Sequence, residues 1–204
     1  MQDRFVAVKG KKLQAAVAGE GPPLVLLSGS SVLFPTLEYA PLASILTGAY
    51  QVMIPAKFGY GMSDPTSERR DVDTVVEEHR AALAALGIAP PVVLAAHSMG
   101  FLEALRWAQK YPEEVSALVG IDPATPECYR KFNVDSYADQ IERLARPGMM
   151  HRVMTAFSVP KMLKRLSLSK EEMRRYLPYA RRNFFGPTLV NEARALRENI
   201  DLVD

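Results

Sequence analysis

The sequence has little that would tie it to a membrane, to nucleic acid or to an oxidising compartment. It contains a single cysteine, Cys128, so no internal disulfide can form, and we expect a reducing, cytoplasmic setting. No apolar run approaches the roughly 20 residues needed to cross a bilayer, and residues 1–5 are charged with no long apolar run after them. The formal net charge of +2 is too small to indicate nucleic acid or a membrane surface as partner.

Motifs for cofactors are also missing. No histidines or cysteines have metal-ligand spacing, and no glycine-rich phosphate loop precedes a helix, so we expect no cofactor. Hydrophobic residues make up 48% and charged residues 24%, a balance typical of globular proteins and not of disordered ones. A chain of 204 residues is long enough for one domain with a sizeable core and a helical insertion.

Short apolar runs alternate with helical patterns in the first half of the chain. This alternation predicts an α/β fold: a mostly parallel sheet of about six strands with helices on both faces. The expected strands are a hairpin over 5–8 and 13–17, then 24–27, 51–54, 91–96 and 116–121. Continuous β-branched and leucine runs are typical of strands buried on both faces.

Helices are predicted over 71–86 and 99–110, and Gly87 marks the end of the first. After Asp122 the pattern is helical with no convincing strand. Prolines at 147, 160, 178 and 187 predict that this segment is divided into short helices. We therefore expect a core over 1–122 and a C-terminal helical cap over 123–204, lying across one edge of the sheet.

The most informative stretch is residues 92–100, Val-Val-Leu-Ala-Ala-His-Ser-Met-Gly. A buried strand passes through small-x-Ser-x-Gly directly into a helix. In so sharp a turn the serine backbone is strained, and its neighbours two residues away, Ala96 and Gly100, must be small. The hydroxyl of Ser98 then stands at a helix N-terminus, where developing negative charge is favoured. Ser98 is the candidate nucleophile.

In sequence, residues 24–127 resemble the core of the α/β-hydrolase superfamily, and within it the bacterial serine-esterase-like members with His-Ser-Met after the fifth strand. Ser-Gly-Ser-Ser at 28–31 lies where the family usually has His-Gly-x-x. Phe-Gly-Tyr-Gly-Met-Ser-Asp at 58–64 matches its Gly-x-Gly-x-Ser loop, and residues 107–115 match the helix and turn before the sixth strand. The two glycines of that loop, Gly59 and Gly61, are interpreted as a tight structural turn.

The resemblance implies hydrolysis of a small-molecule carboxylic ester or related acyl substrate through Ser98. It also implies an oxyanion hole built from two backbone N–H groups, those of Met99 and of Ser30, the latter directly after Gly29. Each donor aimed at a tetrahedral oxyanion is worth about 3 kcal/mol of transition-state stabilisation.

A serine nucleophile needs a base and a carboxylate that orients the base. In the family the order is serine, acid, then a histidine after the eighth strand; six strands are predicted here, so the resemblance implies that the histidine lies outside this chain. We expect His97 to point away from Ser98, His79 to be a solvated helix residue, and His151 to pack within the cap. Asp122 is the candidate acid, with capping of the turn before Pro123 as the alternative.

The predicted cap is basic and rich in methionine and phenylalanine. Its basic residues indicate either attraction for an anionic substrate or a solvated helical face, and the second interpretation is favoured. They are Arg143, Arg146, Arg152, Lys161, Lys164, Arg165, Lys170, Arg174, Arg175, Arg181 and Arg182. Its apolar residues are interpreted as cap core rather than substrate contacts: Met149, Met150, Val153, Met154, Phe157, Met162, Leu163, Phe184 and Phe185.

Three functional hypotheses remain open at this point. The first is an esterase-type hydrolase whose histidine comes from a C-terminal segment or a second polypeptide. The second is a non-catalytic module that binds a ligand without turning it over. The third is a truncated product, in which the sixth strand would be an exposed apolar edge that favours self-association or pairing with a second chain.

Overall fold

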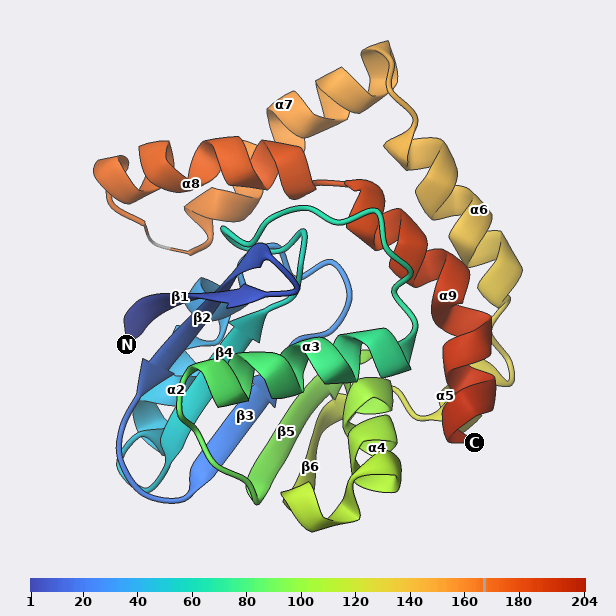
Figure 1. Cartoon of the computed structure of the whole chain (residues 1–204). Helices are drawn as coiled ribbons and strands as arrows, with labels where there is room; N and C mark the ends of the chain where they lie inside the picture. The colour runs from blue at the N-terminus through green and yellow to red at the C-terminus, as the bar shows by residue number, and fades with distance from the viewer. Residues whose placement is uncertain (167) are drawn as a thin grey trace.

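In the computed structural model, which describes residues 1–166 and 168–204, a twisted six-stranded sheet is packed between helices and extended by a C-terminal run of helices (Figure 1). The strand order is β1-β2-β4-β3-β5-β6. β1 and β2 pair antiparallel, as do β2 and β4, and the remaining pairs are parallel. The expected α/β class with a mostly parallel sheet is confirmed.

The strands are β1 (Gln2–Val8), β2 (Lys11–Ala18), β3 (Pro23–Leu27), β4 (Gln51–Ala56), β5 (Val92–Ser98) and β6 (Val115–Pro123). The helices of the first part are α1 (Pro35–Glu38), α2 (Ala40–Leu46), α3 (Val72–Ala85) and α4 (Gly100–Lys110), with a 3-10 turn, η1 (Pro112–Glu114). The helices of the second part are α5 (Pro126–Tyr129), α6 (Val134–Ala145), α7 (Met149–Lys164), α8 (Lys170–Asn183) and α9 (Pro187–Val203).

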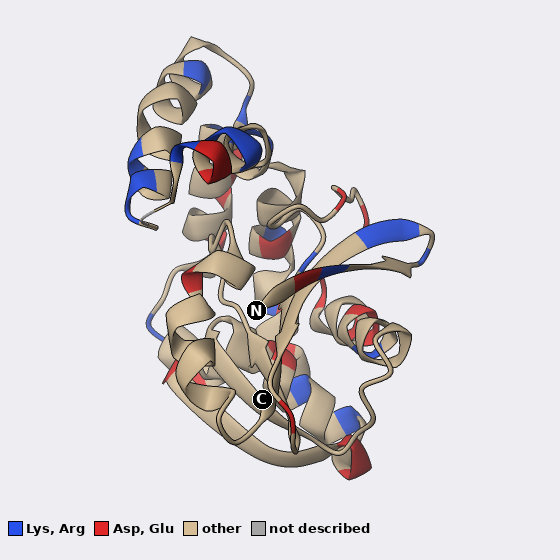
Figure 2. Ribbon diagram, turned by 90° about the vertical axis from the view of Figure 1, so that its left-hand side faces the viewer, with Lys and Arg blue, Asp and Glu red and all other residues tan. Residues whose placement is uncertain are grey.

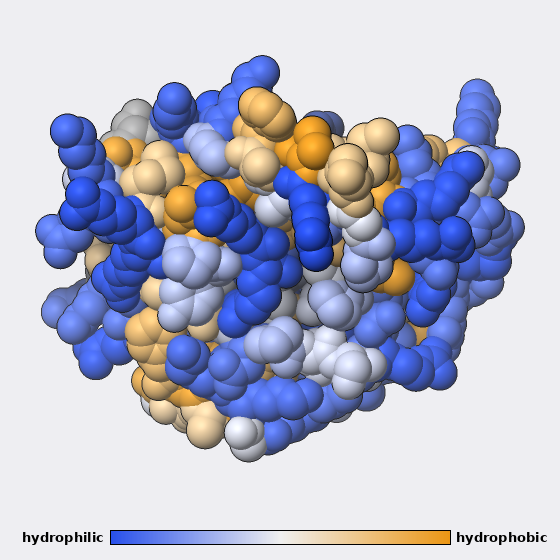
Figure 3. Space-filling view, turned by 90° about the horizontal axis from the view of Figure 1, so that it is seen from above, coloured by the Kyte–Doolittle hydropathy of each residue, from blue (hydrophilic) through white to orange (hydrophobic). Residues whose placement is uncertain are grey.

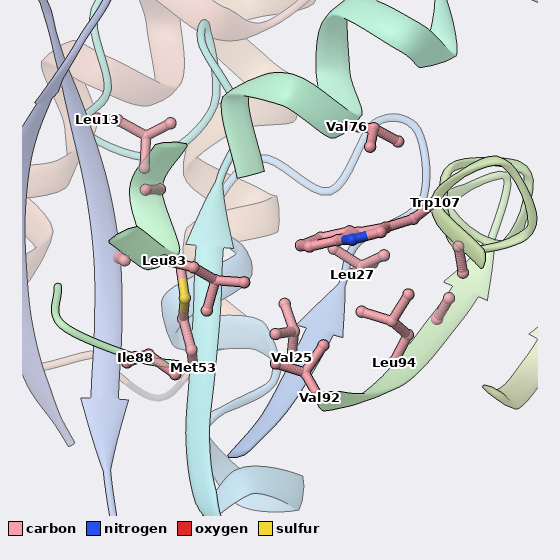
Figure 4. Close-up of a cluster of buried hydrophobic side chains, with 14 of the residues drawn as sticks. Leu13, Val25, Leu27, Met53, Val76, Leu83, Ile88, Val92, Leu94 and Trp107 are labelled. Carbon is pink, nitrogen blue, oxygen red and sulfur yellow. The ribbon is translucent and has the colours of Figure 1, made fainter. Parts of the chain in front are cut away.

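Successive residues of the central strands point to opposite faces of the sheet and supply two cores. In β3, Val25 and Leu27 pack on the α3 and α4 side with Trp107, whereas Leu24 and Leu26 pack on the α2 side with Ala43. Figure 4 shows the indole of Trp107 lying over Leu27 and its neighbours in the first of these cores. This period-two division explains why strands buried on both faces read as unbroken apolar runs.

Helix α3 begins where the sequence predicts. Asp71 is its N-cap and accepts a hydrogen bond from the Thr74 N–H at 2.9 Å. Its end is followed by Gly87 in a left-handed conformation, as expected for a C-terminal stop. The short helices α1 and α2, which cover the other face of the sheet, were not anticipated.

The second part of the chain is helical throughout its described residues, but the prediction that all four prolines divide it is wrong. Pro147 lies between α6 and α7, and Pro187 opens α9. Pro160 and Pro178 instead lie inside α7 and α8. A proline within a helix loses one backbone hydrogen bond, and packing of the apolar faces of α7 and α8 against each other offsets that loss here.

The last strand, β6, forms an edge of the sheet and is more exposed than its apolar sequence predicts. Leu118 is 37% and Val119 46% exposed, because no helix covers the outer side of this strand within the described residues. The expectation of a strand buried on both faces is therefore wrong for β6. Among the helices that the structure describes, none has the length and apolarity to span a bilayer.

Candidate active site

Ser98 is the last residue of β5, and only Met99 separates it from Gly100, where α4 begins. Its backbone has φ of +50°, a left-handed conformation that a non-glycine residue adopts only when its surroundings impose it. Strand, strained serine and helix are thus arranged as the sequence pattern predicts for a nucleophile turn.

The loop after β3 packs directly on this turn. A Cβ atom on Gly100 would lie 2.7 Å from the carbonyl oxygen of Ser28, and a Cβ atom on Gly29 would lie 2.9 Å from the Cβ of Ser98. Both positions therefore require glycine for space. The consequence is that the backbone at Ser28 and Gly29 packs closely against the turn at Ser98.

Two backbone N–H groups beside Ser98 are free to bind an oxyanion. In the part of the chain that the structure describes, neither the Ser30 N–H nor the Met99 N–H donates to a protein acceptor. The N–H of Ser31, by contrast, donates to the hydroxyl of Tyr60 at 3.3 Å. The side-chain hydroxyl of Ser30 is buried and makes no hydrogen bond of normal geometry with a described residue. Of the donors in this loop, the one at Ser30 remains available.

None of the described histidines hydrogen-bonds to the Ser98 hydroxyl. His97 Nδ1 lies 3.0 Å from the hydroxyl of Tyr39, so its ring is engaged beside the loop after β3. His151 Nδ1 lies 3.1 Å from the carbonyl oxygen of Leu144. The interpretation of His79 as a solvated residue is wrong: it is 1% exposed, its Nε2 lies 3.0 Å from a carboxylate oxygen of Glu103, and its ring stacks on Trp107.

Asp122 lies at the end of β6 with φ of +47° and an exposed side chain. β6 pairs with β5 here, Pro123 lying opposite Ser98, and the Ala124 N–H donates to the Ser98 carbonyl at 3.1 Å. The Asp122 carboxylate makes no hydrogen bond or ion pair with any described residue, and the N-cap of the following helix α5 is Thr125. Asp122 therefore lies on the strand next to that of Ser98, and both residues are at the carboxyl ends of their strands.

A buried cluster of charged side chains lies behind the site and was missed by sequence analysis. Lys57 Nζ lies 2.8 Å from Glu103 Oε1 and 3.3 Å from Glu192 Oε1, and these three residues are 1%, 4% and 2% exposed. Burial alone lowers the pKa of Lys57, but the negative charges of Glu103 and Glu192 raise it more. Arg70 pairs with Glu78 beside the cluster. Single charged residues within loops and helices give no periodic signal of burial.

The apolar residues of α7 differ from their predicted role. Leu163 and Phe184 are buried, as cap core should be, but four others are exposed: Met149 at 82%, Met150 at 74%, Val153 at 48% and Phe157 at 76%. Figure 3, which looks down on the upper helices, shows apolar patches between hydrophilic side chains. All the basic residues named above for this segment are exposed. Lysine and arginine also predominate over acidic residues on these helices in Figure 2.

The hollows of the molecule differ in their relation to Ser98. One of about 400 Å³ is lined by residues such as Leu83, Gly87 and Pro90, near the start of β5. Ser98 is at the other end of that strand, about 20 Å away if each residue advances about 3.3 Å. A smaller one of about 120 Å³ is lined by Leu33 and Phe34 from the segment after the oxyanion loop and by Met162, Leu163 and Leu166. A third hollow, of about 10 Å³, is lined by Met99, the residue after Ser98, together with Glu103 and Glu192. No cluster of potential metal ligands occurs among the residues placed in the structure.

Comparison with known proteins gives a consistent picture. Residues 22–191 match the model of a family described as the alpha/beta hydrolase fold. The chain is 31% identical over 196 residues to the uncharacterized protein YbdG of Bacillus subtilis, covering 92% of this chain and 59% of that protein. It is 27% identical over 118 residues to the cis-3-alkyl-4-alkyloxetan-2-one decarboxylase of Shewanella oneidensis, covering 56% of this chain and 36% of that enzyme. The chain thus spans less than two thirds of the length of these relatives.

Solved structures agree on the fold. An epoxide hydrolase from Vigna radiata superposes with a TM-score of 0.71 at 22% identity, covering 98% of this chain and 73% of that one. A haloalkane dehalogenase from Bradyrhizobium elkani gives a TM-score of 0.70 at 18% identity, covering 99% and 74%. Because proteins named for different reactions share this architecture, the reaction must be argued from the residues at the nucleophile turn.

Proposed function

Since this chain belongs to the α/β-hydrolase fold family, we propose that it is a serine hydrolase in which Ser98 attacks the carbonyl carbon of a carboxylic ester or related acyl compound. The observation that carries the proposal is the left-handed Ser98 between a buried strand and a helix, with two unengaged backbone N–H groups beside it. In this mechanism Ser98 Oγ forms a bond to the carbonyl carbon, and the N–H groups of Met99 and Ser30 stabilise the oxyanion.

The proton of Ser98 must pass to a base as the bond forms. Because no described histidine reaches this hydroxyl, the base in the proposal is a histidine from outside these 204 residues, oriented by Asp122. The same histidine then protonates the leaving alcohol, and water releases the acyl group from Ser98. The helices over 123–204 form the cap in this scheme. The hollow beside Leu33 and Phe34, whose lining is mostly apolar but includes Glu38 and Arg165, suits the acyl chain.

Chemical rescue tests the proposal on the chain as it stands. Imidazole added to the solution can replace a missing histidine if the nucleophile and oxyanion donors are in place. We expect imidazole to accelerate acylation by a p-nitrophenyl ester, which releases p-nitrophenolate, and phosphonylation by a fluorophosphonate, which releases fluoride. Either is read by intact mass as a single adduct on Ser98. The adduct is absent in Ser98→Ala and unchanged in Ser116→Ala, a serine exposed on β6. Equal labelling of wild type and Ser98→Ala would contradict the proposal.

The second candidate is a non-catalytic binding module. The observation in its favour is that the Ser98 hydroxyl has no histidine partner among the described residues. It predicts a saturable shift in melting temperature with an acyl compound, the same in wild type and Ser98→Ala, and no adduct at any imidazole concentration.

A further inference from the structure

A continuous series of hydrogen bonds, part-buried at Ser31 and buried at Tyr60 and Glu192, joins the loop beside Ser98 to helix α9. The Ser31 N–H donates to the Tyr60 hydroxyl at 3.3 Å, and the Tyr60 O–H donates to a carboxylate oxygen of Glu192 at 2.5 Å. Lys57 Nζ lies 3.3 Å from the other oxygen of Glu192. Tyr60 and Glu192 are 3% and 2% exposed, and they are separated by 132 residues in sequence. Such a chain is expensive to bury and specific in its geometry.

The donor and acceptor of each hydrogen bond in this series follow from the chemistry of the groups. A phenol has one proton, and Tyr60 uses it to donate the hydrogen bond to a carboxylate oxygen of Glu192. The phenol oxygen is therefore left as an acceptor, and it faces the Ser31 N–H. Burial, followed by the charge of Glu192, raises the pKa of Tyr60 well above its usual value, so the phenol stays protonated near neutral pH.

Tyr60 is held in place from both sides. A Cβ atom on the neighbouring Gly59 would lie 2.0 Å from the side-chain oxygen of Thr188, in the first turn of α9. The turn between β4 and α3 therefore touches α9 without room for a side chain, and Glu192 lies one helical turn further on. Tyr60 cannot follow the loop if the loop moves.

The loop that contains Ser31, at the other end of this series of hydrogen bonds, has a strained backbone. Ser31 has φ of +65°, a left-handed conformation that is unfavourable for a residue with a Cβ atom. Strain of this kind persists only where surrounding contacts oppose relaxation. The bond from the Ser31 N–H to the Tyr60 hydroxyl is one such contact, and it acts on Ser31 itself. It fixes the peptide plane adjacent to the one that carries the Ser30 N–H.

We propose that Tyr60, anchored by Glu192, is a positioning residue that holds the Ser28–Ser31 loop so that the Ser30 N–H faces the oxyanion formed at Ser98. This inference rests on the proposed function for its catalytic consequence. It makes the end of the helical segment, through Glu192, part of the support of the oxyanion hole.

The test compares Tyr60→Phe with Tyr50→Phe, a half-buried tyrosine whose hydroxyl makes no hydrogen bond with a described residue. The first readout is the rate of Ser98 labelling by a fluorophosphonate with imidazole present. Full loss of one oxyanion donor costs 10²–10³ in rate, so a misplaced donor is expected to slow labelling about tenfold. The second readout is hydrogen exchange of the Ser31 amide, expected to be at least about tenfold faster once its acceptor is gone. Tyr50→Phe should change neither.

A second variant separates positioning from general loss of stability. Glycine accepts a positive φ without strain, so Ser31→Gly removes the tendency of the loop to relax. We expect Tyr60→Phe/Ser31→Gly to regain most of the labelling rate while its melting temperature stays as low as that of Tyr60→Phe. A merely structural role of Tyr60 would leave the double variant as slow as the single one, and that result overturns the proposal.

The two proposals fail in different ways. If wild type is never labelled on Ser98, the proposed function fails, and the exchange of the Ser31 amide still decides whether Tyr60 holds the loop. If wild type is labelled and Tyr60→Phe matches it in both rate and exchange, the positioning role is wrong. Should Tyr60→Phe not fold, Glu192→Gln takes its place. Its amide oxygen is a weaker acceptor, and the same two readouts should shift in the same direction by a smaller factor.

Discussion

Replacing Lys57 by methionine tests the buried charged cluster most directly. Lys57 is the cation shared by Glu103 and Glu192, at 2.8 and 3.3 Å, and all three are nearly inaccessible to solvent. Methionine fills most of the space of the lysine stem, so little cavity forms, but both carboxylates lose their cation. Removing one partner of a buried ion pair costs about 3–5 kcal/mol, because the other charge remains buried without compensation. We expect a loss of this size at pH 7.

The assay is urea unfolding followed by fluorescence of Trp107, the only tryptophan of the sequence, which is 1% exposed. The matched control is Lys9→Met, at an exposed lysine 3.9 Å from Glu68. A surface pair of this kind contributes about 0–1 kcal/mol, so the control should unfold close to wild type. A loss in Lys57→Met below about 1 kcal/mol, or one equal to that of Lys9→Met, would refute the reasoning from burial.

The pH dependence of this difference has a definite sign. In the wild type, burial raises the pKa of Glu103. The charge of Lys57 and the hydrogen bond from His79 lower this pKa by more than burial raises it, so the pKa is lowered overall. Its contribution to stability is then present above the unfolded pKa of about 4.3 and is lost as pH falls through the folded value. Without Lys57 burial dominates, and we expect the pKa of Glu103 to be raised instead. When the pH falls, protonation of Glu103 then removes the uncompensated buried charge from the variant, and the variant loses less stability.

The gap in unfolding free energy between wild type and Lys57→Met should therefore narrow from pH 7 to pH 5. A gap that stays constant would mean that the carboxylate of Glu103 is not the group left uncompensated. A double variant, Lys57→Met/Glu103→Met, removes that group together with its cation, so part of the lost stability should return.

Three further changes test local features. Gly100→Ala places a Cβ atom 2.7 Å from the Ser28 backbone and should lower the melting temperature by several degrees, whereas Gly48→Ala, with its nearest contact at 3.7 Å, should not; equal melting curves would contradict the close approach. Asp71→Ala removes the N-cap bond of α3 and should cost about 1 kcal/mol in urea unfolding, with Asp71→Asn close to wild type. Trp107→Ala empties the first core and should cost about 3–5 kcal/mol, measured by circular dichroism.

The sequence predicts those elements whose determinants lie within a few residues of each other. The hairpin of β1 and β2 closes through Lys9 and Gly10, both with positive φ, and the pattern Lys-Gly between two apolar runs marks it. The turn at Ser98 was predictable for the same reason, since its small neighbours at positions 96 and 100 are required by the turn itself. The apolar strands and the glycine that ends α3 likewise follow from short patterns.

Contacts between distant segments decided what could not be predicted. His79 has charged neighbours in sequence, which suggested solvent, yet α4 covers it and supplies Glu103 as its partner. Pro160 and Pro178 suggested helix breaks, but packing of α7 on α8 keeps both helices continuous. In each case tertiary packing overrides a local preference worth only a few kcal/mol.

The candidate site likewise depends partly on local contacts and partly on contacts between segments that are distant in sequence. This difference determines what a substitution at each position would test. Ser98 and its small neighbours form a local unit, so a change there alters the nucleophile itself. The oxyanion loop is held by Tyr60, and Tyr60 by Glu192, through bonds that span 29 and 132 residues. A variant of Glu192 is therefore expected to affect acylation without touching the substrate, because it acts on the loop through a tyrosine. If a substitution in α9, which is remote in sequence from Ser98, lowers activity, the loss would then indicate a misplaced oxyanion donor and not a missing catalytic group.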